Sequence, residues 1–308
     1  MHQKSIEEAK KRLFRGELVI FPTETVYGIG GNANNQKSIE LIYRTKNRPI
    51  SNPLICHFAN IEEIEKNFIL KDKDYELANT FWPGPLTLIL EKKINSMISP
   101  FLSNNKNQVG CRIPNNEISL SLLSIIDFPI AAPSANIATR TSVTSIDDLD
   151  YKLKEIFYID GGSSVLGLES TVIQTTENGC KVLRLGSLTT EEIKIKFPKY
   201  EISIEQSNVS PGNQLKHYSP IKPIRINVDF VKKNETLLNF GINKLTSDIK
   251  SLNLSIDENL SDASYNFYNY LNILDSINCS GIAVAPIPDQ GLGKTINDRL
   301  RRASYKDE

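Results

Sequence analysis

The apolar residues of this chain follow two patterns, a helical spacing and short uninterrupted runs. These patterns separate the expected helices from the expected strands. Ile6, Ala9 and Leu13 follow one another at helical spacing behind a capping-box pair, and this predicts a helix over residues 5–15. The uninterrupted apolar run at 18–21 is typical of a short buried strand. A helix followed directly by a strand is the first unit of a layered α/β arrangement.

The same alternation continues as far as residue 197. Strands are expected at 54–58, 86–90, 108–113, 128–132, 156–159, 171–174 and 181–185. Helical segments are expected near 39–43, 61–68, 72–81, 116–126 and 146–154. Gly28, Gly30 and Gly31 predict a turning or closely approached backbone. Strands and helices that alternate in this way indicate an α/β fold.

Beyond residue 197 the pattern loosens, and turn-forming residues gather around Pro211 and Gly212. We therefore expect a first domain at 1–200, a linker at 201–222 and a small second α/β domain at 223–308. The elements expected in the second domain are strands at 224–228 and 281–286, a helical stripe at 267–277 and a basic helix at 294–303.

Composition indicates a folded two-domain protein and weakens the case for two classes of partner. The chain has 308 residues, of which 40% are hydrophobic and 23% are charged. The 36 basic and 36 acidic residues cancel, which removes bulk charge as an argument for binding nucleic acid or a membrane surface. Glu7 and Glu8 stand where a signal peptide needs apolar residues, so we expect a cytoplasmic protein.

Cysteine and histidine spacing favours neither a redox pair nor a metal site. Cys56, Cys111, Cys180 and Cys279 are far apart in the sequence, and we expect reduced, structural thiols. The only histidines are His2, His57 and His217, and none stands at the short spacing of a zinc-binding motif. We therefore expect neither a structural nor a catalytic zinc ion.

The polar side chains that could carry chemistry stand in loops after expected strands, which is where open α/β sheets bind ligands. Thr23, Glu24 and Thr25 follow the strand at 18–21. Two hydroxyls and a carboxylate suit a ligand contact, and the same residues could simply shape a turn.

Lys46 and Arg48 place two cations on a loop that Pro49 and Pro53 restrict. Together they suit a polyphosphate, because lysine supplies a point charge and arginine a planar fork. Basic residues at the end of a helix also interact favourably with its dipole, so a solvated helix end is the alternative.

Arg112 lies at the end of the apolar strand expected at 108–113. A partly buried guanidinium needs an anion, because burial of an unpaired charge is costly. A small carboxylate ligand or a structural Asp or Glu would satisfy it equally well.

Two hydroxyl-rich loops around Ser134 and Ser170 also follow expected strands. Ser134 has no nucleophile-elbow sequence and no obvious His–Asp pair, so a serine-hydrolase triad is not expected. The segment 291–295 ends like a phosphate-binding P-loop, but Pro288 replaces its first glycine, and we expect no such loop.

In chain order these motifs resemble those of the threonylcarbamoyl-AMP synthases, in the long form with a YrdC-like domain, a linker and a C-terminal domain. The matching segments are PTETVYG at 22–28, KNRP at 46–49, SNPL at 51–54, WPGPLTLIL at 82–90, GCRIP at 110–114, PSAN at 133–136, ESTV at 169–172, LRLGS at 183–187, SPGNQLKHYSP at 210–220 and GLGKTINDRLRRAS at 291–304. The resemblance covers nearly the whole chain. It implies a twisted open mixed sheet flanked by helices, followed by a small Rossmann-like α/β domain.

The resemblance also implies which residues act. The catalytic signature of the family falls on Lys46, Arg48, Ser134 and Asn136. Contacts to L-threonine would come from Thr25, His57, Arg112, Ala132 and Ser170. Contacts to ATP would come from Arg48, Asn52, Ser134, Ser142, Arg184 and Tyr218, with the His217–Tyr218 part of the linker acting as a lid over the nucleotide.

The implied activity is the synthesis of threonylcarbamoyl-AMP and pyrophosphate from L-threonine, bicarbonate and ATP, the first step of tRNA threonylcarbamoyladenosine modification. Such a nucleotidyltransferase would use Mg²⁺ with its ATP and pass its product to a downstream threonylcarbamoyl-transfer complex. Stable binding of nucleic acid or membrane is not expected. Glu24 is a candidate general base, and a structural carboxylate is the alternative.

Two other functions compete with this hypothesis. An RNA-binding YrdC-like module without adenylation activity could hold an RNA backbone in a basic concavity, but zero net charge and the lack of an aromatic–basic motif count against it. The carbamoyl-transfer enzyme of hydrogenase maturation shares the YrdC-like domain. It would need cysteine-rich zinc fingers, which this sequence does not have.

Overall fold

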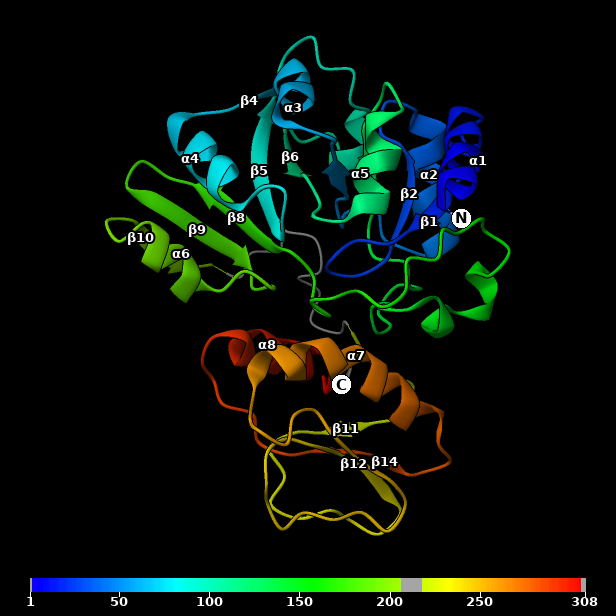
Figure 1. Cartoon of the computed structure of the whole chain (residues 1–308), viewed down its shortest axis with the longest axis vertical. Coiled ribbons are helices and arrows are strands. Elements are labelled where there is room, and N and C mark those ends of the chain that lie inside the picture. Colours follow the sequence, from blue (N-terminus) through cyan, green and yellow to red (C-terminus); the bar gives the residue numbers. More distant parts are fainter. Residues whose placement is uncertain (1, 206–217, 306–308) are drawn as a thin grey trace.

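The computed structural model describes residues 2–205 and 218–305, which form two domains. Figure 1 shows the N-terminal domain above the C-terminal domain, with two helices of the latter between its own sheet and the upper domain. Within these described ranges, no helix is long and apolar enough to cross a membrane.

The first domain is built on one mixed ten-stranded sheet. Its strands are β1 (Val19–Phe21), β2 (Gly28–Asn32), β3 (Ile55–His57), β4 (Phe68–Ile69), β5 (Leu86–Lys92), β6 (Gln108–Arg112), β7 (Ile130–Ala131), β8 (Thr171–Thr175), β9 (Gly179–Arg184) and β10 (Glu201–Ile204). The order is β1-β2-β7-β3-β6-β5-β8-β9-β10, and β4 pairs with β5. β3 runs parallel to β6, β5 to β8 and β9 to β10, while the other pairs are antiparallel. This mixed sheet confirms the expected architecture.

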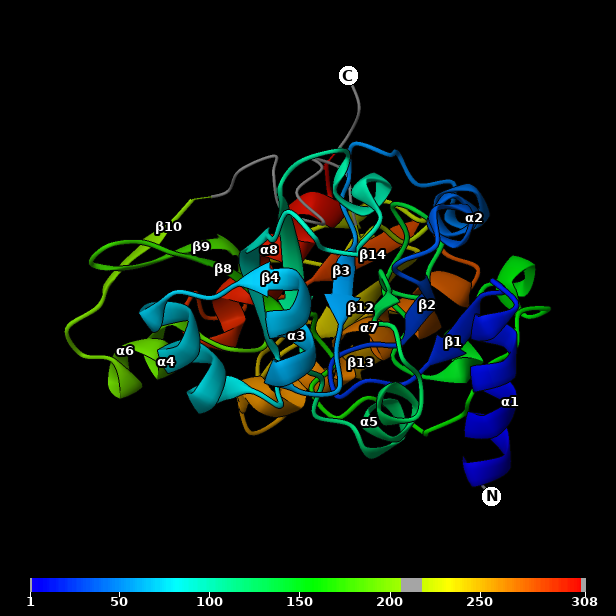
Figure 2. The same cartoon turned by 90° about the horizontal axis from the view of Figure 1, so that it is seen from above.

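Helices cover both faces of this sheet (Figure 2). They are α1 (His2–Phe14), α2 (Gln36–Lys46), α3 (Ile61–Asn67), α4 (Asp72–Phe81), α5 (Glu117–Ser124) and α6 (Thr190–Lys196). α1 and α5 pack together against β1 and β7 through a cluster that includes Leu13, Phe21 and Leu122. A larger cluster contains Ile39 of α2 and Leu77 of α4. The apolar stripes read from the sequence are therefore the buried faces of these helices.

The second domain has four parallel strands in the order β11-β14-β12-β13. They are β11 (Ile224–Arg225), β12 (Glu235–Asn239), β13 (Ser251–Asn253) and β14 (Gly281–Val284), and they pack against α7 (Leu260–Ser276) and α8 (Leu292–Ala303). Neighbouring residues of one strand face opposite sides, so Leu238 joins the cluster with the helices while Leu237 joins a small cluster apart from it. This arrangement confirms the small α/β domain.

The expected linker begins too early in the chain. Residues 201–204 form β10, which pairs in parallel with β9 and belongs to the sheet of the first domain. Their backbone hydrogen bonds go to β9, which α6 separates from them in the sequence, and local turn signals do not reveal such a pairing. Residues 206–217, including His217, lie outside the described residues.

Three local expectations also differ from the structure. Residues 156–159 form no strand of their own and make only one isolated bridge, between Ile20 and Tyr158. The helix expected at 146–154 is two short 3₁₀ turns. Gly28 to Gly31 lie in strand β2 rather than in a turn, although the close approach is present. A Cβ at Gly30 would lie 2.4 Å from Cγ2 of Ile130.

Candidate active site

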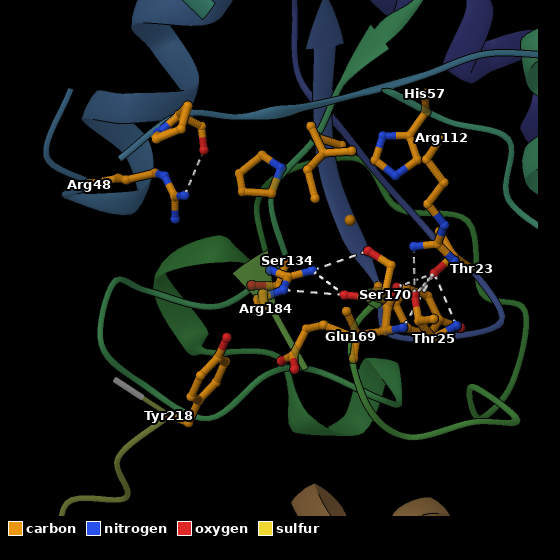
Figure 3. A pocket seen from close by; sticks show the side chains of 17 residues that line it. Thr23, Thr25, Arg48, His57, Arg112, Ser134, Glu169, Ser170, Arg184 and Tyr218 are labelled. Atoms are coloured by element: carbon orange, nitrogen blue, oxygen red, sulfur yellow. Dashed lines mark hydrogen bonds between the residues drawn. The ribbon is translucent and has the colours of Figure 1, made fainter. Parts of the chain in front are cut away.

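One pocket of the first domain gathers most of the side chains singled out in the sequence (Figure 3). Nine of the expected residues line it: Thr25, Arg48, His57, Arg112, Ala132, Ser134, Ser170, Arg184 and Tyr218. Four others, Lys46, Asn52, Asn136 and Ser142, are not among its lining residues. Each of these four instead bonds to a residue that lines the pocket.

The pocket has two ends of different character, as Figure 3 shows. We call one the Arg112 end, which consists of Thr23, Thr25, His57 and Arg112. We call the other the Arg48 end, which consists of Arg48, Ser134, Arg184 and Tyr218. Glu169 and Ser170 lie between the two ends.

The Arg112 end stands on two neighbouring parallel strands. His57 ends β3 and Arg112 ends β6, and the two residues are partners in the strand register. The guanidinium of Arg112 donates from Nη1 to Oγ1 of Thr25 over 2.9 Å and from Nε to the carbonyl of Gly84 over 3.2 Å. The sheet therefore fixes both side chains at the same edge.

Glu24 is a structural carboxylate beside Arg112, one of the two kinds of partner that the sequence allowed. Its Oε1 lies 2.6 Å from Nη2 of Arg112, and both side chains are 4% exposed. The angles of this ion pair do not meet those of a hydrogen bond, so Nη2 and both Glu24 oxygens lack an aligned partner among the described residues. Nδ1 of His57 is also buried and has no hydrogen-bond partner among the described residues. Buried polar atoms without aligned partners are costly, so a polar ligand that bonded to them would be bound favourably.

His57 is held neutral in this site. Burial lowers the pKa of His57 to about 3, and the nearby charge of Arg112 acts in the same direction. The imidazole can therefore accept or donate a hydrogen bond at neutral pH without carrying charge.

Arg48 projects from the loop after α2. Asn47 ends this helix in the left-handed conformation, at φ 54°, and turns the chain towards the pocket. Arg48 donates to Oδ1 of Asn52 over 2.7 Å and to the carbonyl of Pro53 over 2.9 Å. Asn52, expected to contact ATP, thus orients Arg48 from behind.

Lys46 is locked beneath the loop that carries Ser134. Its ammonium is buried at 1% exposure and donates to the carbonyls of Ser134 and Asn136. Ser134 in turn donates its hydroxyl to the side chain of Asn136. Lys46 and Asn136, both expected to be catalytic, therefore hold the loop in place rather than line the pocket.

Lys46, the last residue of α2, and Arg48, on the loop that follows, are two basic groups whose pKa values are lowered. Burial lowers the pKa of Lys46 well below its usual range, and the charge of Arg48 adds to the effect. Burial lowers the pKa of Arg48 to about 10. Neither side chain pairs with a carboxylate in the part of the chain that the structure describes. A bound anion would offset the cost of burying Arg48, which lines the pocket.

Arg184, at the end of β9, approaches the middle of the pocket. Its Nη2 donates to the carbonyl of Ser170 over 2.7 Å and to the hydroxyl of Ser170 over 3.1 Å. The hydroxyl of Ser170 also lies 2.8 Å from that of Thr87. Ala132 is buried at the rim, where its N–H donates to the carbonyl of Ile55.

Glu169 was missed by the sequence analysis as a site residue, although it stands in the ESTV motif. Its carboxylate accepts hydrogen bonds from Ser142, from Tyr268 over 2.8 Å and from Arg299 over 2.9 Å. Burial raises the pKa of Glu169, but the charges of Arg299 and Arg184 and these hydrogen bonds outweigh it, so the pKa lies below its usual range. Tyr268 and Arg299 belong to the second domain.

The segment 291–295, which resembles the end of a P-loop, contacts the first domain. Gly291 caps α8, Lys294 pairs with Glu191 over 2.6 Å, and Thr295 donates to the carbonyl of Gly186 over 2.9 Å. The described residues contain no group of three or more His, Cys, Asp or Glu side chains that could hold a metal ion.

Known proteins resemble this chain over nearly its full length. A family model described as Telomere recombination matches residues 11–186, and one described as Threonylcarbamoyl-AMP synthase, C-terminal domain, matches residues 181–304. The chain is 33% identical to a threonylcarbamoyl-AMP synthase of Pyrococcus abyssi, over 97% of this chain and 95% of that protein. It is also 33% identical to one of Bacillus subtilis, over 97% of this chain and 92% of that protein.

The fold leads to the same family. The crystal structure of P. abyssi Sua5 complexed with L-threonine matches with a TM-score of 0.86 at 31% identity, over 99% of this chain and 95% of that one. Both domains are included in this match, as they are in the two family models. The chain therefore belongs to the threonylcarbamoyl-AMP synthase family of enzymes.

Proposed function

We propose that the chain is a nucleotidyltransferase that makes threonylcarbamoyl-AMP and pyrophosphate from L-threonine, bicarbonate and ATP. The observation that carries this proposal is the pairing of two unlike ends in one pocket. The Arg112 end offers buried polar atoms without aligned partners, and the Arg48 end offers the guanidinium of Arg48, which pairs with no carboxylate among the described residues. An amino acid suits the first end and a polyphosphate the second.

L-Threonine would bind at the Arg112 end. Its carboxylate would accept from Nη2 of Arg112, while its amine and hydroxyl would face Glu24, His57 and the threonine hydroxyls of the site. The presence of L-threonine in the crystals of the P. abyssi relative supports this assignment. Glu24 stabilises Arg112 and also lies where it could accept the proton of the amine.

ATP would bind at the Arg48 end, with its phosphates near Arg48, Ser134 and Arg184 and with Tyr218 against the nucleotide. The two carboxylates of the site, Glu24 and Glu169, are engaged by Arg112 and Arg299. The described side chains therefore offer no carboxylate cluster for a cation. We propose that Mg²⁺ enters with ATP, bound to its phosphates, as part of the substrate.

The proposed chemistry needs positioning more than a reactive side chain. The amine of threonine attacks bicarbonate and water leaves, which forms a carbamate. A carbamate oxygen then attacks the α-phosphorus of ATP, and the bond to pyrophosphate breaks. The residues of the two ends hold the reacting groups in line and neutralise the phosphate charge.

The product is a mixed anhydride and is labile in water. We therefore propose that it passes to a downstream threonylcarbamoyl-transfer complex that modifies tRNA. Arg112 and Arg184, which line the pocket, are buried rather than displayed on a surface, which favours a small-molecule anion over an RNA backbone as the ligand of this site.

The proposal is tested by following pyrophosphate release with each substrate omitted in turn, and by detecting threonylcarbamoyl-AMP with mass spectrometry. Release should require L-threonine, bicarbonate and ATP together. Arg48→Met should reduce turnover at subsaturating ATP, whereas Arg44→Met, at an exposed position of α2, should not. Equal ATP cleavage without threonine would refute the proposed function.

A further inference from the structure

The side chain of Arg299 crosses from the second domain into the first. Arg299 lies on α8, and its side chain is 0% exposed. Nε donates to Oε2 of Glu169 over 2.9 Å, and Nη2 donates to the carbonyl of Leu185 over 2.7 Å. Both acceptors belong to the first domain, and only the contact of Nη1 with Asp298 stays within α8.

The same guanidinium contacts a second residue that lines the pocket. Its Cζ lies 4.5 Å from the centroid of the Tyr218 ring. Tyr218 is 1% exposed, and the ring of Tyr268 from α7 lies 6.1 Å from it, centroid to centroid. Arg299 therefore contacts two residues that line the pocket, Glu169 through an ion pair and Tyr218 across the face of its ring.

A guanidinium suits this place better than any other side chain. A buried charge is tolerated only when its partners satisfy it, and Arg299 has two carboxylates, a carbonyl and a ring. The planar fork can bond Glu169 with one edge while its face lies over an aromatic ring. An ammonium cannot do both.

We propose that Arg299, although it belongs to the second domain, is a positioning residue of the pocket, which acts on the Arg48 end through Tyr218 and Glu169. The inference rests on the proposed function only in taking the Arg48 end as the end that binds the nucleotide. The second domain is then a part of the active site and more than a neighbour of it.

The charges around Glu169 explain why the Arg48 end would depend on Arg299. Glu169 is stabilised by two guanidinium charges, those of Arg299 and Arg184. Without Arg299, the carboxylate would depend on Arg184, which would draw that guanidinium towards Glu169 and away from a phosphate. The Arg112 end has its own partners, Glu24 and Thr25, and should be unaffected.

The test compares Arg299→Met with the double variant Glu169→Gln/Arg299→Met. Removal of Arg299 alone leaves a buried carboxylate without its main partner and lowers the melting temperature. The double variant removes both charges, so the melting temperature should recover. Arg301→Met is the matched control, because Arg301 lies on the same helix, is 56% exposed and reaches only Asp289. Calorimetric titrations of the whole protein with a non-hydrolysable ATP analogue and with L-threonine give the two affinities.

We expect both Arg299 variants to bind the ATP analogue about tenfold more weakly, because Tyr218 loses the cation–ring contact that holds it in position at the Arg48 end. L-Threonine should bind all variants within about twofold of the parent. A double variant that regains both stability and analogue affinity would overturn the proposal, because Arg299 would then be only the counter-ion of Glu169. Unchanged analogue affinity in Arg299→Met would overturn it too. Failure of the parent to bind either ligand would instead refute the proposed function.

Discussion

The two ends of the pocket are built in different ways. At the Arg112 end, His57 and Arg112 stand at the ends of adjacent strands of one sheet. At the Arg48 end, Arg48 stands on a loop, and Tyr218 follows residues outside the described ranges and packs on the second domain. One end is thus complete within a single domain, whereas the other is completed by two.

This difference separates an end of the pocket that one sheet holds in place from an end that depends on contacts between two domains. Strand ends are rigid, so the Arg112 end presents its hydrogen-bonding groups with little freedom and suits recognition of one small amino acid. The Arg48 end depends on packing between domains, so its geometry is set by the contacts of Arg299 with Tyr218 and Glu169. The lid role expected of the linker stays a prediction, for which the buried position of Tyr218 is the support.

The largest expected effect is a loss of L-threonine binding when the Arg112 end is changed. Arg112→Lys should weaken L-threonine binding by about 10- to 150-fold, or ~1.5–3 kcal/mol, because an ammonium cannot replace the planar fork that faces Thr25 and Glu24. Binding of an ATP analogue should stay within about twofold. Calorimetry with both ligands checks this, and a lysine variant with parental threonine affinity would remove Arg112 from the substrate site.

The second prediction concerns Lys46 and the loop of the Arg48 end. Lys46→Met leaves the carbonyls of Ser134 and Asn136 without their buried donor, which should cost about 1–3 kcal/mol of folding free energy. Affinity for the ATP analogue should fall as the loop relaxes, while threonine affinity is preserved. Urea denaturation and calorimetry measure the two effects. Lys37→Met, at an exposed position of the same helix, should change neither, and equal behaviour of the two variants would contradict the prediction.

The third prediction uses pH to probe the Arg112 end. The pKa of His57 is lowered to about 3 in the folded state, so between pH 3 and 6.5 the unfolded state binds one more proton at this residue. Its contribution to stability is present above pH 6.5 and is lost as the pH falls. From pH 7.5 to 5.5 the parent should lose about 1.4 kcal/mol more than His57→Gln, measured by denaturation at each pH. Parallel pH curves would show that His57 takes up its proton as readily in the folded as in the unfolded protein, and that its pKa is not lowered by folding.

The smallest expected effect tests the contact between the domains. Gly167 has φ 73°, and a Cβ there would lie 2.1 Å from the carbonyl oxygen of Ser264 on α7. Gly162 has φ 74° but no atom within 4 Å of such a Cβ. Both alanine variants are destabilised by the left-handed backbone conformation, so this cost cancels in the comparison. The overpacking at residue 167 should make Gly167→Ala less stable than Gly162→Ala by about 1 kcal/mol, the lower end of what overpacking costs.

If the comparison of the two ends is right, Gly167→Ala should also weaken binding of the ATP analogue, because the displaced second domain carries Arg299 and Tyr268. Threonine affinity should be the same in both glycine variants. Calorimetric titration of each variant decides this, and a parallel loss of both ligands would show that the two ends are not independent.

Much of the fold could be predicted because it is set locally. The helix expected at 72–81 is α4 (Asp72–Phe81), since its apolar spacing and acidic first turn act within the helix itself. β10 (Glu201–Ile204) could not be predicted in the same way. It is a short edge strand whose only described strand partner is β9, so its neighbouring residues show little of its conformation.

The candidate site likewise has features that the sequence shows locally and features that depend on tertiary packing. The sequence determined that Lys46, Arg48 and Arg112 stand at the ends of regular elements, where buried cations need anions. Tertiary structure decided that Glu24 faces Arg112, that Lys46 holds a loop, and that Arg299 reaches Glu169 in the other domain. The physical reason is that a charged residue in an apolar segment shows only that it needs a partner of opposite charge or a hydrogen-bond partner. Which residue becomes that partner depends on the packing of segments far apart in the chain.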